Sequence, residues 1–432
     1  MKILFKDANI ISKTGKSLKG RNIFIDNEYI SYVEKDIINI KDDADRVINA
    51  ENMLLIPGLY NTHTHLPMTI FKGYAEDMTL DKWLFDKIFP AEDKLTEEIV
   101  YYATLLGIAE QIKNGVISCS DMYFFTENML PAVEESGIKI NACRAVQSFD
   151  ENESPKDNFR FTEAKMLYKN YHNSANGRIK IDMSIHAEYT ANLNIIKAVA
   201  EYSNENKIIN HVHISETQKE HDECIQRYGK TPCEFFNSLA FFDSPTLAAH
   251  CVHVSERDMD IIKAKGVTIA HNPSSNLKLA SGIADVVRML EKGINVTLGT
   301  DGSASNNNLD ILKEMYLASV LQKGITGSPT VMPAKEMLKF ATENSANMQG
   351  RKDSGSIEIG KRADITVLDL NSLEASPIYD YSSALVYSMS GRNVILTMCD
   401  GKILYENGEY KTIDIEKIKY KIKKLVEKYY AE

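Results

Sequence analysis

The hydrophobic and polar positions follow one pattern near the N-terminus of this chain and another through its middle. Residues 1–55 alternate in short runs separated by turns such as Thr14-Gly15, and residues 29–33 are a typical run. Alternation with a period of two predicts strands, so we expect β-structure without helices here. From Leu54, short apolar runs alternate with long segments of helical period, which predicts βα units and a parallel sheet.

Eight apolar runs predict the strands of one closed barrel. They cover residues 54–60, 116–121, 138–145, 179–185, 208–213, 246–250, 267–270 and 295–299. Between the first two runs, Thr96 is a good helix N-cap and Gly115 a good terminator, so we expect a helix between them. Eight βα repeats predict an α/β fold of the (β/α)8 TIM type, in which reactive side chains lie at the carboxyl ends of the strands.

The last part of the chain returns to strand patterns, which predicts a smaller domain built from both ends. Residues 363–368 and 393–398 are predicted strands, and residues 414–430 are predicted to form a lysine-rich helix with a solvated charged face. The later strands could complete the N-terminal β-unit as a discontinuous β-sandwich. The expected divisions are residues 1–55 for the first part of the sandwich, 56–354 for the barrel, and 355–432 for the second part with the helix.

Composition and charge narrow the class of protein. The 432 residues carry 60 acidic and 50 basic side chains, and this net charge of −10 argues against a nucleic-acid partner, which a basic surface would attract. The sequence contains no run of about 18 apolar residues, so no membrane span is predicted. The six cysteines form no CxxC pair, unlike a disulfide framework, and favour a reducing, cytoplasmic location.

Metal-binding residue types are concentrated where predicted strands end. Residues i and i+2 of a strand point to the same side, so the pair at the end of the first strand should face the barrel mouth together. The residues at four strand ends are His63 and His65 (first), His213 and Glu216 (fifth), His250 (sixth) and Asp301 (eighth). Buried ionisable groups must be paired or ligated, and imidazole and carboxylate bind catalytic metals. The pattern therefore predicts a metal-dependent hydrolase.

The same segments resemble a known family. Residues 57–68, which contain His63-Thr64-His65, and the motif Gly299-Thr300-Asp301-Gly302 are similar to motifs of the amidohydrolase superfamily. Within it, residues 71–77 followed by Trp83-Leu84 resemble the 5-methylthioadenosine/S-adenosylhomocysteine deaminases. The resemblance implies hydrolytic deamination of 5'-thio-substituted adenosines, with adenosine as a further candidate. S-adenosylhomocysteine would become S-inosylhomocysteine and 5'-methylthioadenosine would become 5'-methylthioinosine, each with release of ammonia.

The resemblance also implies a metal centre and its catalytic groups. One divalent ion, usually zinc, with iron(II) and manganese(II) as alternatives, would be held by His63, His65, His213 and Asp301. Such an ion lowers the pKa of a bound water and generates hydroxide near neutral pH. Glu216 and Asp301 would move protons, with Glu216 protonating a purine ring nitrogen, and His250 would orient the nucleophile.

The implied substrate contacts come from several strand ends. They are Glu92, as the ribose-binding carboxylate, Arg144, His186, Glu216 and Asp301. A second basic residue for the 5' substituent stays open between Lys156 and Arg160. His211 shares the parity of His213 but lies one layer deeper, so we expect a satisfied core histidine. His271 follows the seventh strand and is expected to shape the site.

Other classes stay open at this point. A deaminase or chlorohydrolase of another aminated heterocycle, such as guanine, a pterin or an s-triazine, would have no use for a ribose-binding carboxylate at Glu92. Amide or ester hydrolysis is disfavoured because binuclear relatives use a carboxylated lysine where this chain has Ile185-His186-Ala187. A non-catalytic scaffold would be expected to lose Asp301 or Glu216. A small purine nucleoside is the expected partner, and a homo-oligomer is implied by the resemblance alone.

Overall fold

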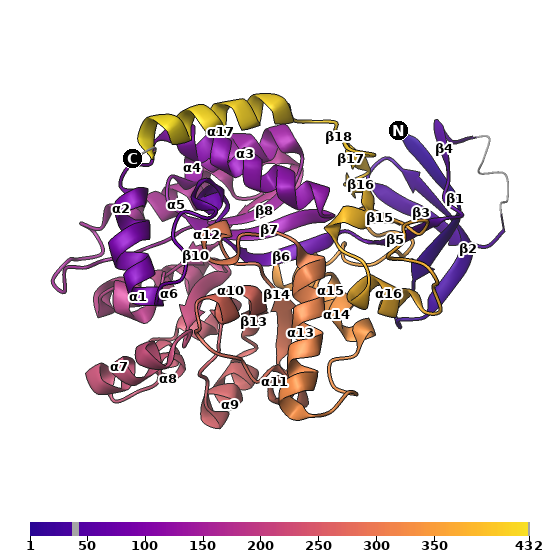
Figure 1. Cartoon of the computed structure of the whole chain (residues 1–432). Coiled ribbons are helices and arrows are strands. Elements are labelled where there is room, and N and C mark those ends of the chain that lie inside the picture. The colour runs from indigo at the N-terminus through magenta and orange to yellow at the C-terminus, as the bar shows by residue number, and fades with distance from the viewer. Residues whose placement is uncertain (37–42, 431–432) are drawn as a thin grey trace.

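Eight parallel strand positions surround the centre of the barrel in the computed structural model, which describes residues 1–36 and 43–430 (Figure 1). The fold is therefore the predicted TIM-type barrel. Its strands are β6 (Leu59–Thr64), β7 (Val116–Tyr123), β8 (Lys139–Arg144), β9 (Ile179–Ile181) with β10 (Met183–Ser184), β11 (Asn210–Ile214), β12 (Thr246–His250), β13 (Thr268–His271) and β14 (Asn295–Leu298).

The ladder of strand-to-strand hydrogen bonds around the barrel is interrupted at two places, and other contacts close the barrel there. β6 to β9 form one sheet and β10 to β14 another, and the fourth strand joins them across Asp182, which divides β9 from β10. On the opposite side β14 meets β6, where the Asp301 amide donates to the His63 carbonyl at 2.9 Å and the Thr62 hydroxyl donates to the Leu298 carbonyl at 2.9 Å. The second closure fixes Asp301 beside His63.

Helices surround the strands and cover the barrel mouth. The predicted helix after Thr96 is confirmed, because the Thr96 hydroxyl accepts a hydrogen bond from the Ile99 amide at 3.3 Å and caps the helix. The barrel helices are α3 (Glu97–Lys113), α4 (Thr126–Ser136), α5 (Phe159–Tyr171), α6 (Leu193–Asn206), α7 (Gln218–Tyr228), α8 (Pro232–Ser238), α9 (Glu256–Lys265), α10 (Pro273–Lys278), α11 (Val286–Glu291), α12 (Ser303–Asn306), α13 (Ile311–Thr326), α14 (Ala334–Phe340) and α15 (Glu343–Met348). Short helical segments lie near the mouth: η2 (Leu66–Phe71), α1 (Leu80–Lys82), η3 (Trp83–Ile88) and α2 (Phe89–Glu92).

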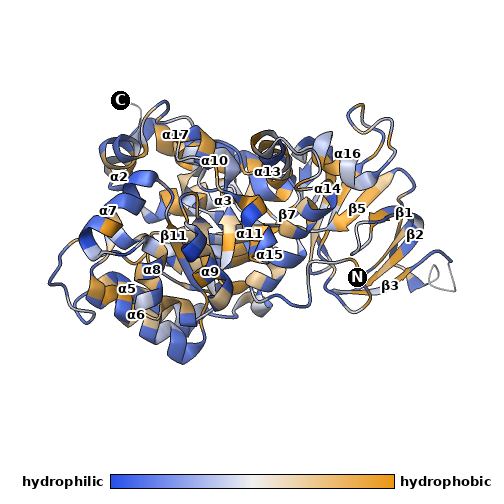
Figure 2. Cartoon of the chain, turned by 90° about the horizontal axis from the view of Figure 1, so that it is seen from below, coloured by the Kyte–Doolittle hydropathy of each residue, from blue (hydrophilic) through white to orange (hydrophobic). Residues whose placement is uncertain are grey.

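Strands from both ends of the chain form a second sheet beside the barrel, visible as indigo and yellow arrows in Figure 1. Its members are β1 (Lys2–Ile11), β2 (Ser17–Asp26), β3 (Tyr29–Glu34), β4 (Arg46–Asn49), β5 (Met53–Pro57), β15 (Ile365–Asp369), β16 (Val394–Cys399), β17 (Lys402–Glu406) and β18 (Glu409–Tyr410). β1 pairs with β4 through its first half and with β5 through its second half. Its side chains enclose a separate core, and orange segments mark apolar residues along β5 and the neighbouring strands in Figure 2.

The single strand predicted over residues 54–60 is wrong. β5 ends at Pro57 in the small sheet, whereas β6 begins at Leu59 in the barrel. Both strands are buried, so the apolar run continues through the change of sheet and hides it. Gly58 lies between them, and a Cβ there would be 2.5 Å from Ile117 Cγ1, so the close approach of the two sheets requires glycine.

The small sheet is held to the barrel by buried ion pairs, and the C-terminal helix packs on a barrel helix. On β8, the Lys139 ammonium lies 2.6 Å from Asp364 Oδ2 and 2.7 Å from Asp400 Oδ1. The C-terminal segment α16 (Tyr381–Tyr387) and helix α17 (Ile415–Tyr429) complete the fold, and α17 crosses the molecule to pack on α3 (Figure 1). The predicted last helix is therefore confirmed, with Ile418 and Leu425 buried.

In the described part of the chain, no helix has the length and apolarity needed to cross a bilayer.

Candidate metal centre and active site

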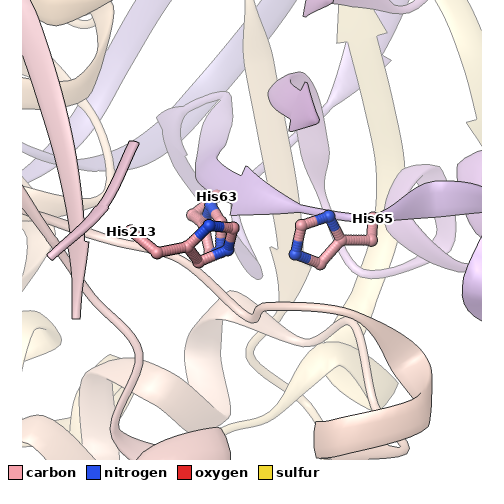
Figure 3. Close-up of side chains that lie close together, drawn as sticks. All are labelled: His63, His65 and His213. Carbon is pink, nitrogen blue, oxygen red and sulfur yellow. The ribbon is translucent and has the colours of Figure 1, made fainter. Parts of the chain in front are cut away.

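Side chains from separate barrel strands meet at the carboxyl ends of those strands. Potential ligand atoms of His63, His65 and His213 lie within 4.8 Å of one another, and so do those of His63, His250 and Asp301. Asp301 Oδ1 is 3.4 Å from His63 Nε2 and 3.1 Å from His65 Nε2. Figure 3 shows the rings of His63, His65 and His213 around a common space. The sequence-predicted cluster is thus brought together by the barrel.

Hydrogen bonds orient these histidines as ligands. His65 Nδ1 lies 2.5 Å from the Met122 carbonyl, and His213 Nδ1 lies 2.7 Å from the His186 carbonyl. Since a carbonyl oxygen only accepts, both Nδ1 atoms carry a proton, and Nε2 is the atom of each ring that can bind a metal. His63 Nδ1 pairs with His211 Nε2 at 2.8 Å, and His63 Nε2 is buried without a hydrogen-bond partner in the described chain. A divalent cation fits this set of three imidazoles and one carboxylate.

Burial and mutual charges shift the pKa values of the clustered residues in different directions. Burial lowers the pKa of His63 to about 4 and that of His213 well below its usual value, so both imidazoles are neutral and free to act as ligands. Burial also opposes the charged form of His65, but the hydrogen bond and charge of Asp301 outweigh it and raise the pKa of His65 to about 9. Burial disfavours the Asp301 anion, yet the two histidines hold its pKa well below the usual range. The carboxylate is therefore ionised.

Two further side chains with acid–base chemistry border the same space. Burial raises the pKa of Glu216, whose Oε1 accepts a hydrogen bond from the Ser281 hydroxyl at 3.1 Å. Its Oε2 lies 3.8 Å from His250 Nε2, and His250 Nδ1 donates to Asn276 Oδ1 at 2.8 Å. A carboxyl with a raised pKa is suited to carry a proton near neutral pH.

The backbone around these groups is held in unusual conformations. His250 has φ of 71°, Asp301 has φ of 62° and Ser215 has φ of 46°, all in the left-handed region that non-glycine residues rarely adopt. The Glu220 carboxylate accepts hydrogen bonds from the Ser215 amide at 2.8 Å and the Glu216 amide at 2.7 Å. These contacts stabilise the turn that aims Glu216 at the metal cluster, and such local strain is typical of functional sites.

The cluster opens into two adjoining cavities. The inner one, of about 70 Å³, is lined by the polar cluster and by apolar side chains such as Trp83 and Leu84. The outer one, of about 600 Å³, is lined mainly by phenylalanines and charged side chains. Phe89, Glu92 and Phe124 border both cavities. Glu92 therefore lies at the junction between a reactive inner chamber and a wide outer one.

The predicted substrate residues fall on both sides of that junction. Glu92 Oε1 accepts a hydrogen bond from the Tyr123 hydroxyl at 2.6 Å, and burial raises the pKa of Glu92 to about 7. His186 lines the inner cavity, whereas Arg144 lines the outer one and donates from Nε to Glu163 Oε2 at 2.7 Å.

The structure also places the residues whose roles the sequence left open. Arg160 lines the outer cavity, while Lys156 borders a separate surface hollow. His211 is fully buried and bonded to His63, and so it is a satisfied core histidine as expected, though one that contacts a candidate ligand. His271 is buried at the end of β13, and neither ring nitrogen has a hydrogen-bond partner among the described residues. Its site-shaping role stays a prediction.

Sequence reasoning missed several supporting residues. Tyr123 lines the inner cavity and Glu163 lines the outer one. The Ser275 hydroxyl donates to Asp301 Oδ2 at 2.6 Å. Ser281 supports Glu216 in the same way. Serines and tyrosines of this kind carry no spacing signal in the sequence. Tyr123 alone had an indication, because it lies two residues beyond the end of the second predicted strand, on the mouth side.

Comparison with known proteins defines the class. A model of the amidohydrolase family matches residues 54–404, and the chain belongs to this family of hydrolases. Over 99% of both chains, it is 43% identical to a 5-methylthioadenosine/S-adenosylhomocysteine deaminase of Acetivibrio thermocellus. It is 40% identical to a 5'-deoxyadenosine deaminase of Methanobrevibacter smithii, over 98% of this chain and 97% of the relative. A zinc-bound adenosine deaminase from Xanthomonas campestris is similar in structure, with a TM-score of 0.93 and 27% identity over 100% of this chain and 99% of that one.

Proposed function

We propose that this protein deaminates 5'-substituted adenosines by hydrolysis, converting the 6-amino group of the purine to a 6-oxo group and releasing ammonia. One observation carries the proposal: Glu92 lies where the inner cavity beside the metal cluster meets the outer cavity. A nucleoside placed with its purine in the inner cavity would have its ribose at Glu92 and its 5' substituent in the outer cavity. The full-length similarity to deaminases of such nucleosides supports the same substrate class.

The proposed cofactor is one zinc ion held by His63, His65, His213 and Asp301. When bound, such an ion lowers the pKa of a water molecule and so supplies a nucleophile near neutral pH. Zinc is favoured by the donor set and by the zinc in the similar adenosine deaminase structure. Metal analysis of the purified protein would test this part, with about one zinc per chain expected.

The chain's own residues would carry the protons. Glu216, whose pKa burial raises, would protonate the purine ring nitrogen beside C6. Asp301 would take the proton of the attacking water and pass it to the departing amine. His250, fixed through Asn276, would orient the water. The water oxygen bonds to C6, the bond between C6 and the amino nitrogen breaks, and ammonia leaves with one of the water protons. The second water proton returns to Glu216, which has given its own proton to the ring nitrogen, as the 6-oxo group forms.

Substrate recognition is assigned to residues around the junction. Glu92 would accept hydrogen bonds from the ribose hydroxyls, because its Oε1 accepts one from the Tyr123 hydroxyl and its Oε2 accepts none from the described part of the chain. His186 would border the nucleoside in the inner cavity, and Arg144 would border the 5' substituent in the outer one.

The test is ammonia release and the ultraviolet change that accompanies conversion of 6-amino to 6-oxo purine. S-adenosylhomocysteine, 5'-methylthioadenosine, adenosine and guanine are compared at equal concentration. We expect the 5'-substituted adenosines to react fastest, and the Glu216→Gln variant to lose most of the activity while retaining metal. A preference for guanine would refute the ribose assignment and move the substrate to a free heterocycle.

Two attributes complete the proposal. A cytoplasmic location is supported by cysteine usage, and all six cysteines are buried free thiols. A homo-oligomer is an expectation of the family resemblance. Cell fractionation tests the first, and sedimentation equilibrium of the purified protein tests the second.

A further inference from the structure

The outer cavity combines an aromatic lining with a small group of charges. Its aromatic side chains are Phe89, Phe124, Phe125, Phe149 and Phe159. Among its charged side chains, Arg144 and Arg160 lie against this lining: the Arg144 guanidinium is 5.1 Å from the Phe124 ring centre, and that of Arg160 is 4.5 Å from the Phe159 ring centre. Glu163 of α5 is the carboxylate paired with Arg144. A cavity for purely apolar groups would have no use for these charges.

The Arg144–Glu163 pair leaves both partners with bonding capacity. Arg144 donates from Nε to Glu163 Oε2 and from Nη1 to the Ala145 carbonyl, and its Nη2 donates to no group of the described chain. Glu163 accepts only at Oε2, so its Oε1 is unengaged within residues 1–36 and 43–430. The Arg144 side chain is 6% exposed and that of Glu163 is 33% exposed. The pair therefore offers one cationic donor and one anionic acceptor side by side, and the acceptor faces the open cavity.

Those two groups match the two charges of an α-amino acid. A carboxylate can accept from Arg144 Nη2, with Arg160 nearby as a second cation, while an ammonium group donates to Glu163 Oε1. A ligand tail with a carboxylate alone would place a second anion near Glu163. A methyl or methylthio tail would contact the phenylalanines and leave both charges unused. The arrangement is thus complementary to a zwitterion more than to either simpler tail.

We propose that Glu163 is a specificity-determining residue that binds the α-ammonium group of an amino-acid tail on the 5' side of the nucleoside. This inference rests on the proposed deamination of 5'-substituted adenosines and adds a substrate preference to it. It favours substrates such as S-adenosylhomocysteine over analogues of equal length that lack the amino group. The reaction at C6 is unchanged, because Glu163 lies in the outer cavity, away from the metal cluster.

The experiment compares S-adenosylhomocysteine with 4-(5'-adenosylthio)butanoate, which differs from it only by loss of the amino group. The quantity measured is the ratio of kcat/KM for the two substrates, since a general effect of a substitution on the enzyme cancels in that ratio. We expect the wild-type ratio to be about tenfold in favour of the amino-acid substrate, as for one charge-assisted hydrogen bond. In Glu163→Gln the ratio should fall to within about twofold of one, and Glu163→Asp should recover part of it.

Glu127→Gln is the matched control. Glu127 is an exposed glutamate of α4 that accepts a hydrogen bond from the hydroxyl of Tyr171, and Tyr171 lies on α5 as Glu163 does. It should keep the wild-type ratio. A ratio unchanged by Glu163→Gln, or a higher kcat/KM of that variant for S-adenosylhomocysteine, would overturn the inference, since Glu163 would then only neutralise Arg144. If the wild-type enzyme deaminates 5'-methylthioadenosine but has equal kcat/KM for the two longer substrates, the Glu163 inference is overturned and the proposed function stands. Failure to deaminate any adenosine would instead defeat the proposed function.

Discussion

Removing the Glu92 carboxylate should separate nucleoside recognition from the chemistry at C6. Glu92 borders both cavities, and Tyr123 occupies only one of its oxygens, at 2.6 Å. If the other oxygen receives one or two ribose hydroxyls, and each hydrogen bond to a charged group contributes about 1.5–3 kcal/mol, Glu92→Ala loses about 3 kcal/mol. The kcat/KM for 5'-methylthioadenosine should then fall about 150-fold, mainly through KM.

The effect should depend on pH in a defined direction. Burial raises the pKa of Glu92 to about 7, so the carboxylate that makes charge-assisted bonds is present above pH 7 and is protonated below it. The ratio of wild-type to Glu92→Gln kcat/KM should therefore be larger above pH 7 than below it. Tyr123→Phe is the control, because it leaves both oxygens of Glu92 available to ribose and should cause a smaller loss.

A cycle with deoxy substrates identifies the contact itself. Removing the 2'- or 3'-hydroxyl should slow the wild-type enzyme but have little further effect on Glu92→Ala, because the bonding partner is already gone. The assay is the ultraviolet change on deamination, measured under kcat/KM conditions. Equal losses from the missing hydroxyl in both proteins would refute the reasoning and place the ribose elsewhere.

Three further perturbations address the metal centre and the fold. Near pH 6, zinc binding to metal-free protein should release about one proton per ion, because His65, with a pKa of about 9, must lose its proton to become a ligand while a metal-bound water is still largely un-ionised. Calorimetry in buffers of different ionisation enthalpy measures this, and the absence of net release would contradict it. Lys139→Met should lower the free energy of unfolding by about 3–5 kcal/mol, since the buried Asp364 would lose its partner, and an unchanged urea midpoint would argue against this. Gly299→Ala should destabilise the protein by about 1–3 kcal/mol and reduce its metal content, because the new Cβ would lie 2.8 Å from His63 Cβ; full metal occupancy would contradict this.

The strand positions and the metal cluster could be predicted because both depend on local sequence and on one property of the barrel. Each βα unit ends its strand at the same edge, so His63, His213 and Asp301, far apart in sequence, had to meet once the strands were located. The capped helix after Thr96 was predictable for a similar reason, since its start signal lies within a few residues.

Features that depend on packing between elements could not be predicted. The division of residues 54–60 into strands of two sheets is invisible in the apolar pattern, because both strands are buried. The break of the fourth strand at Asp182 was missed for the same reason. The choice of Arg160 over Lys156 at the outer cavity, and the pairing of Arg144 with Glu163, depend on how α5 docks against β8. Neither the spacing nor the types of these residues indicate that docking.

The position of β5 also bears on how the chain assembles during synthesis. β5 pairs on one side with β1, which is made early, and on the other side with β15, which is made only after the whole barrel. Until then one edge of β5 presents unpaired backbone groups that can recruit other strands. An N-terminal fragment ending inside the barrel should therefore aggregate through this edge. In the complete protein, β15 pairs with this edge of β5 and so prevents its association with other strands.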